Sequence, residues 1–117
     1  LLKILQDKFG ASDIEYQYRS DLYPFACDFY IKSLDLYIEL QGSWTHGKAP
    51  YDLKNPEHIK KLNDWIQKSQ TSQFYRNAID VWTRADVEKR KTALENGIKL
   101  IEVFDSKTFK ELNFILN

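Results

Sequence analysis

A small set of polar side chains near the centre of the chain could carry out metal-dependent chemistry. Asp28 lies within the apolar residues 25–31, where an uncompensated carboxylate costs several kcal/mol to desolvate. A bound metal ion could compensate it; hydrogen bonds inside the protein are the alternative. Glu39 and Gln41 end the next apolar segment. Carboxylates that converge at strand ends suit Mg²⁺, which prefers oxygen ligands and keeps water for reaction.

A histidine follows these residues on a predicted loop. His46 lies within residues 42–47, among small residues of the type that form flexible loops. An imidazole titrates near neutral pH, so it suits proton transfer to or from water. A surface histidine without a role is the alternative for His46. For His58, on a predicted helix among lysines, we expect no catalytic role.

Three predicted strands follow a predicted helix in the first third of the chain. Residues 1–9 have the pattern of an amphipathic helix that ends at Gly10, and residues 13–19 alternate as a half-buried strand does. Residues 25–31 and 34–41 predict a β-hairpin, with Lys32-Ser33 between the strands. Alternation gives the second strand one apolar face, expected to be core, and one face expected to be exposed and to carry the chemistry. The apolar face has Leu34, Leu36, Ile38 and Leu40, and the other has Asp35, Tyr37, Glu39 and Gln41.

The remaining chain predicts helices and one more strand. Residues 42–55 predict a loop and residues 56–68 a helix, followed by a polar connection. A second helix is predicted over 85–96, and it ends at Gly97. Residues 98–104 then predict a strand and residues 107–116 a helix. This order predicts an α/β (α+β) fold in which a mixed central β-sheet is flanked by helices.

Composition limits the class of protein. At 117 residues and 43% hydrophobic content, the chain fits one domain, residues 1–117. Its formal net charge of zero argues against a protein whose main task is to grip phosphates, unless the charges are segregated or another domain supplies the affinity. A lone Cys27 is typical of reducing cytosol, so we expect a cytoplasmic protein. No stretch approaches the roughly 20 apolar residues of a membrane span. The chain starts without Met in a helical pattern, and we expect a fragment of a longer protein.

Several of these residues together resemble a known family of nucleases. The segments 27–46 and 84–104 resemble the core of the very-short-patch repair endonucleases and of the phage-type EDxHD homing endonucleases, a branch of the PD-(D/E)xK superfamily. The matching positions are Asp28, Gly42, His46 and Asp86. The resemblance implies a restriction-endonuclease-like core and phosphodiester hydrolysis with Mg²⁺, or with Mn²⁺ in its place.

The resemblance also implies residue roles. Asp28 would bind the catalytic Mg²⁺ together with the backbone carbonyl of Leu40. His46 would activate the attacking water, and Asp86 would orient the imidazole. Gln41 stands where these families carry histidine or lysine, so it would hold water or phosphate. Glu39 matches the second acidic position of the ordinary motif and ranks below the others as a metal ligand.

Three departures qualify the resemblance. The first acidic residue of the pattern is expected upstream of Leu1, and Glu15 is a weak substitute. Ser43 replaces one ligand of the family's structural zinc, so no structural zinc is expected. The repair enzymes insert a pair of neighbouring aromatic residues into mismatched DNA, and this chain has only Trp44 at that place. We therefore expect the protein to cleave an intact recognition sequence rather than to repair mismatches.

The implied partner is double-stranded DNA. A separate DNA-binding domain is expected on the parent chain, and the domain could act as a monomer or a homodimer. Candidate DNA contacts, with ordinary solvated charge as the alternative for the basic residues, are Trp44, Lys48, Arg84, Lys89 and Arg90. Trp65 and Trp82, at helical positions, are expected in the core. The alternatives to a site-specific endonuclease are a nuclease-fold module that binds DNA or protein without cleavage, and a mismatch-repair or structure-specific nuclease.

Overall fold

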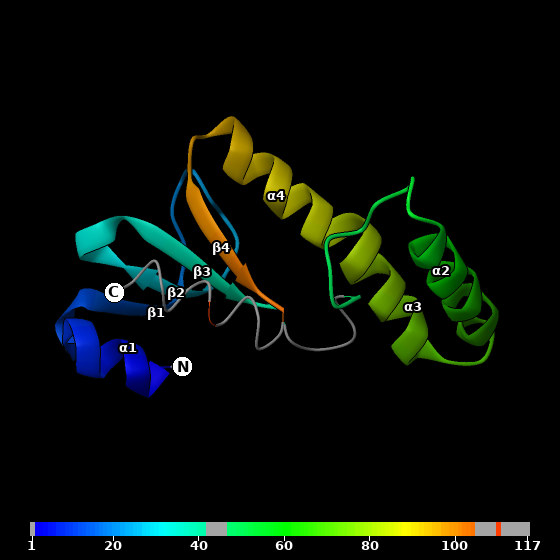
Figure 1. Ribbon diagram of the computed structural model, residues 1–117, viewed down its shortest axis with the longest axis horizontal. Coiled ribbons are helices and arrows are strands. Elements are labelled where there is room, and N and C mark those ends of the chain that lie inside the picture. Colours follow the sequence, from blue (N-terminus) through cyan, green and yellow to red (C-terminus); the bar gives the residue numbers. More distant parts are fainter. Residues whose placement is uncertain (1, 42–46, 105–109, 111–117) are drawn as a thin grey trace. The chain divides into compact units, whose positions relative to one another are not determined.

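The computed structural model describes residues 2–41, 47–104 and 110 (Figure 1). The chain forms two compact units, and each is described by itself. Unit 1 comprises Leu1–Leu40 and Lys89–Asn117, and unit 2 comprises Gln41–Glu88.

Unit 1 is built on a mixed four-stranded sheet. Its strands are β1 (Ile14–Tyr18), β2 (Cys27–Ile31), β3 (Leu36–Leu40) and β4 (Lys99–Val103), in the spatial order β1-β2-β3-β4. Neighbours β1 and β2, and β2 and β3, run antiparallel, whereas β3 and β4 run parallel. The predicted α+β class with a mixed sheet is confirmed.

The predicted hairpin is formed by β2 and β3. The short 3₁₀ turn η2 (Lys32–Leu34) joins the strands, and Asp35 completes the reversal in the left-handed region, with φ 47°. Phe29 pairs with Ile38. The same register, continued by one step, sets Asp28 opposite Glu39.

One face of the sheet packs against α1 (Leu2–Phe9), a helix that ends at Phe9 as predicted. Leu5 and the partly buried Phe9 supply the helix side of this core. The sheet side consists of side chains on alternating strand positions, namely Phe29, Ile31, Leu36, Ile38 and Val103.

The opposite face of β3 is also buried, so the expectation of an exposed face was wrong. Tyr37 and Glu39 are 5% and 3% exposed. The reason is the helix α4 (Asp86–Glu95), because its Ala93 packs into a second core with Tyr23, Cys27 and Tyr37. The side chains that face α4 therefore lie between helix and sheet.

Unit 2 is helical. Its helices are α2 (Pro56–Ser69), α3 (Gln73–Asp80), the π-helical segment η4 (Val81–Ala85) and the first residues of α4. The side chain of Asn55 caps α2 by accepting the N–H of Glu57 at 2.9 Å. The helix predicted over 56–68 is confirmed, but the polar connection predicted after it was wrong, because α3 occupies that stretch.

The core of unit 2 is aromatic. Trp65, Ala78 and Trp82 are buried together, with Tyr75 and Ile79 partly buried against them. The expectation that both tryptophans belong to the core is confirmed. Helix 85–96 and strand 98–104 correspond to α4 and β4, whereas the helix predicted over 107–116 lies outside the described residues except for position 110. Within the part of the chain that is described, no helix is both long and apolar enough for a membrane crossing.

Candidate functional site

Asp28 projects from β2 and connects the strands on both sides. Its Oδ2 accepts the backbone N–H of Leu40 at 2.8 Å, and its Oδ1 accepts Nε2 of Gln17 at 3.3 Å. The side chain is half-buried. An ionised carboxylate offers about four lone-pair sites. These two hydrogen bonds therefore hold the carboxylate in place and leave acceptor capacity for a cation.

Gln17 contributes an unusual backbone to this arrangement. Its φ is 51°, in the left-handed region that a non-glycine residue adopts at a cost of about 1–2 kcal/mol. The strained residue is the one whose amide reaches Asp28. The alternating pattern of residues 13–19 contains no signal for this conformation, so sequence reasoning missed Gln17.

Glu39 lies one residue before Leu40, and its partners among the described residues all belong to unit 1. Its Oε1 accepts the backbone N–H of Asp28 at 3.1 Å, and its Oε2 accepts the hydroxyl of Tyr23 at 2.9 Å. Nζ of Lys89 lies 3.5 Å from Oε2. Burial raises the pKa of the Glu39 carboxyl, and the positive charge of Lys89 is the largest effect that opposes this rise. In this arrangement Glu39 supports the strand that carries Asp28.

Two further buried groups near Glu39 are kept protonated. Burial, followed by the charge of Glu39, raises the pKa of Tyr23, so its hydroxyl stays a hydrogen-bond donor. Burial also raises the pKa of the Cys27 thiol to about 12. The thiol contacts the backbone carbonyls of Phe29 and Ile38 at 3.3 and 3.4 Å. At neutral pH the Cys27 sulfur is therefore neither a nucleophile nor a metal-binding thiolate.

These residues of unit 1 form what we call the carboxylate cluster: Asp28, Glu39, Tyr23 and Lys89. No group of three or more His, Cys, Asp or Glu side chains that could hold a metal occurs among the described residues. Mg²⁺, however, commonly binds proteins through one or two carboxylates and retains several waters. The chemistry of Asp28, with the neighbouring backbone of Leu40, fits such an ion. Glu15, the weak substitute for a further acid, instead pairs with Lys32 at 3.1 Å, at the other end of β2.

Of the predicted DNA contacts, three basic residues bind carboxylates of their own unit. Arg84 bonds Asp80 at 2.6 Å and 2.8 Å. Arg90 places its Nε within 2.9 Å of both carboxylate oxygens of Glu102, and Lys89 pairs with Glu39. Lys48 is exposed, with φ 63°. Trp44 lies outside the described residues.

The other predicted catalytic residues belong to unit 2. Gln41 and Asp86 are 4% and 1% exposed. His46 and Gly42 lie outside the described residues. The roles implied by the resemblance require Asp28, Gln41, His46 and Asp86 to converge, and this convergence stays a prediction.

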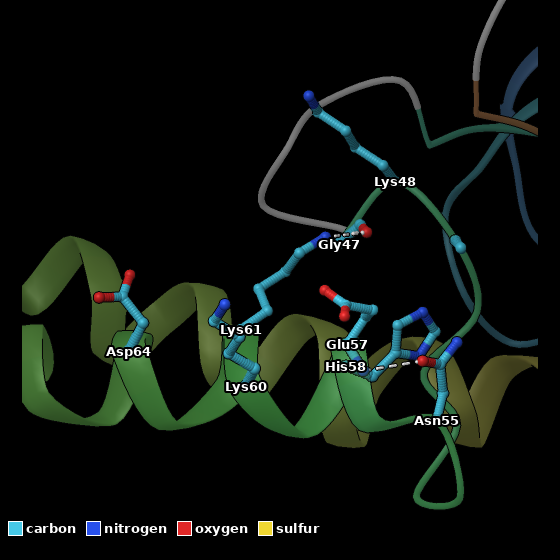
Figure 2. Close-up of a pocket in the computed structure, with 9 residues that line it drawn as sticks. Gly47, Lys48, Asn55, Glu57, His58, Lys60, Lys61 and Asp64 are labelled. Carbon is cyan, nitrogen blue, oxygen red and sulfur yellow. Dashed lines mark hydrogen bonds between the residues drawn. The ribbon is translucent and has the colours of Figure 1, made fainter.

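Gly47, the residue after His46, is fixed against a tryptophan. It has φ 71°, and a Cβ at this position would overlap the indole of Trp82. Its carbonyl accepts Nζ of Lys61 at 2.8 Å (Figure 2). The indole N–H of Trp82 donates to the carbonyl of Ala49 at 2.9 Å. Sequence reasoning identified Gly47 only as a loop residue and did not foresee this anchor.

His58 has a local structural role, in line with the expectation from the sequence. Its Nδ1 accepts the backbone N–H of Asp52 at 3.0 Å. The imidazole packs beside Tyr51 and Trp82.

Comparisons with known proteins add no further assignment. No protein-family model, no curated protein and no solved structure matches this chain.

Proposed function

We propose that this chain is the Mg²⁺-dependent nuclease domain of a site-specific endonuclease that hydrolyses phosphodiester bonds in double-stranded DNA. The observation that carries the proposal is the Asp28 carboxylate. It is half-buried, it is held at the end of β3 by the N–H of Leu40, and it lies next to a second carboxylate whose charge Lys89 offsets.

The fold supports the proposal in part. Unit 1 has the mixed sheet flanked by helices that the resemblance implies, with α1 packed on one face and α4 on the other. The two acidic residues of the proposed site lie on neighbouring strands, the second and the third. Asp28 and Glu39 occupy those strands in this chain.

The proposed chemistry assigns one role to the metal and the rest to the protein. Mg²⁺ bound by Asp28 and the Leu40 carbonyl would neutralise charge on the scissile phosphate. Asp28 would fix the ion because its own carboxylate is already oriented by Leu40 and Gln17. Glu39 would position Asp28 by accepting its backbone N–H.

The proton-transfer roles rest on the sequence resemblance. In the proposal His46 accepts a proton from the attacking water, and Asp86 orients the imidazole and stabilises its charged form. Gln41 would hold water or phosphate by hydrogen bonds, because an amide does not exchange a proton near neutral pH.

Incubation of the protein with plasmid DNA tests the proposal. Cleavage is expected with Mg²⁺ or Mn²⁺ and is expected to stop with EDTA. Cleavage that is equally fast with excess EDTA would contradict the proposal, and so would the absence of any cleavage over a panel of DNA sequences.

A second candidate is a nuclease-fold module that binds DNA or protein without cutting it. The observations that favour it are the occupied oxygens of Glu39 and the amide of Gln41 at the position of a lysine. Titration calorimetry with Mg²⁺ separates the two candidates. The nuclease is expected to bind Mg²⁺ and to lose this binding in Asp28→Asn, whereas the non-cleaving module would bind none in either form.

A further inference from the structure

Unit 2 contains a hollow of about 580 Å³ between residues 47–49 and the first half of α2 (Figure 2). Lysine residues from both walls line it: Lys48 from the first segment, whose side chain extends away from α2, and Lys60 and Lys61 from the helix (Figure 2). Asn55 and His58 line it too. We call this feature the lysine hollow.

The lysine hollow carries an excess of positive charge. Its acidic lining residues are Glu57 and Asp64. Asp64 is already neutralised by Lys68, whose Nζ lies 3.0 Å from its carboxylate. Lys48 and Lys60 are exposed, and neither pairs with a carboxylate among the described residues of this unit. Their ammonium groups are therefore available to an anion.

The hollow is held in shape by contacts within unit 2. The Lys61 ammonium bonds the Gly47 carbonyl and lies 5.4 Å from the ring centroid of Trp82. The Trp82 indole holds Ala49 on the same wall. An ammonium has three donors, so Lys61 keeps donor capacity after it has anchored Gly47. The two walls are thus tied together at one end.

Neutral donors add to the lysines. Because Nδ1 of His58 accepts the N–H of Asp52, the proton of the neutral imidazole is on Nε2, which is a donor. Oδ1 of Asn55 caps α2, which leaves the Asn55 amide N–H groups free to donate. Ammonium, imidazole N–H and amide N–H groups around one hollow are the donor set that phosphate oxygens accept.

We infer that the lysine hollow binds a phosphodiester group of the DNA backbone and gives unit 2 a grip on DNA that does not depend on the metal. This inference rests on the proposed function. It retains Lys48 from the predicted phosphate contacts, adds Lys60, and leaves out Arg84, Lys89 and Arg90, which are paired with carboxylates. The hollow is open and its lysines lie on two walls, so a DNA strand can pass through it. We therefore favour a phosphodiester of DNA over a free phosphate as the ligand.

Binding of a short fluorescent DNA duplex in EDTA tests the inference without cleavage. Anisotropy is measured over a series of salt concentrations for the whole chain, for Lys48→Gln, for Lys60→Gln and for the double variant. Each lysine that contacts a phosphate contributes about 1 to the slope of log K against log salt. The slope is therefore expected to fall by about 1 in each single variant and by about 2 in the double variant.

Matched controls make the result specific. Lys99→Gln removes an exposed lysine of unit 1 and is expected to leave the slope unchanged. Glu57→Gln removes an acidic group from the hollow and is expected to tighten binding. Thermal melts of all variants confirm that the fold is retained.

Three outcomes would overturn the inference. The first is an unchanged slope in the double variant. The second is full competition by inorganic phosphate at the concentration of the DNA phosphates, which would make free phosphate the ligand. The third is equal competition by poly-glutamate, which would indicate an acidic protein surface. Mg²⁺-dependent cleavage is measured separately in the same variants. If the lysine variants leave the slope unchanged while cleavage persists, this inference is wrong and the proposed function stands.

Discussion

The ammonium of Lys89 lies 3.5 Å from Oε2 of Glu39, whose side chain is 4% exposed. Removing the cation leaves a buried carboxylate without its main charge partner. Lys89→Met is therefore expected to lower the free energy of unfolding by roughly 1–3 kcal/mol. This is less than the loss for a fully buried pair, because Lys89 retains contact with water. Urea denaturation at neutral pH measures the change.

The control for Lys89→Met is another lysine of the same helix. Lys91 is 74% exposed and reaches Glu95 at 3.9 Å. Lys91→Met is expected to cost at most about 0.5 kcal/mol. The double variant Lys89→Met/Glu39→Gln should cost less than the sum of its single changes. Strict additivity would show that the two residues do not interact in solution.

The carboxyl of Glu39 makes stability depend on pH. Burial raises its pKa in the folded state above the ordinary 4.5. Between these two pKa values the folded state binds more protons, so the free energy of unfolding falls as pH rises from about 4.5 to the folded pKa. Relative to Glu39→Gln, the parent should lose stability across this window and then level off. Melting temperatures of both proteins over this window measure the effect; parallel curves would contradict it.

A substitution at Gly47 tests the close contact between this residue and the Trp82 indole. Gly47→Ala introduces a Cβ that overlaps the Trp82 indole and also strains a backbone with φ 71°. These two effects together are expected to cost about 2–5 kcal/mol. Gly97→Ala is the matched control, because its φ of 65° gives the same strain while nothing lies within 4 Å of the added atom. Equal losses in urea denaturation would contradict the proposed contact.

Local sequence pattern predicted most of unit 1. The helix before Gly10, the hairpin and the strand after Gly97 each follow from alternation and glycine placement. The missed helix α3 also had a local signal, since Tyr75, Ala78, Ile79 and Trp82 follow the spacing of one helical face. The polar residues between them made this spacing hard to identify. The π-helical segment η4 follows α3 directly and leads into α4.

The partners of the candidate site were beyond sequence reasoning. The partners of Glu39 in the described part of the chain come from distant segments: Tyr23, Asp28 and Lys89. Alternation predicts which face a side chain occupies, but not which helix will cover that face. For this reason we expected Glu39 to be exposed and Lys89 to contact a DNA phosphate.

The proton-transfer residues are expected to differ in their effects on cleavage. His46→Ala should lose roughly 10²-fold or more in rate, the usual scale for removal of a general base. Gln41→Ala should lose less, because an amide only positions water or phosphate. Asp86→Asn should act in the same direction as His46→Ala, and the two changes combined should cost less than the sum of the separate losses. Near-parental activity of His46→Ala, with a dead Gln41→Ala, would refute the His-Asp mechanism.

The most direct test of the central claim is the Mg²⁺-dependent rate of DNA cleavage by Asp28→Asn. The asparagine oxygen can still accept the N–H of Leu40, so melts should show a retained fold, while the anionic ligand for the metal is gone. The exposed Asp21→Asn serves as the control. The account predicts that cleavage is abolished in Asp28→Asn and unchanged in Asp21→Asn. Cleavage at the parental rate by a folded Asp28→Asn protein would contradict it.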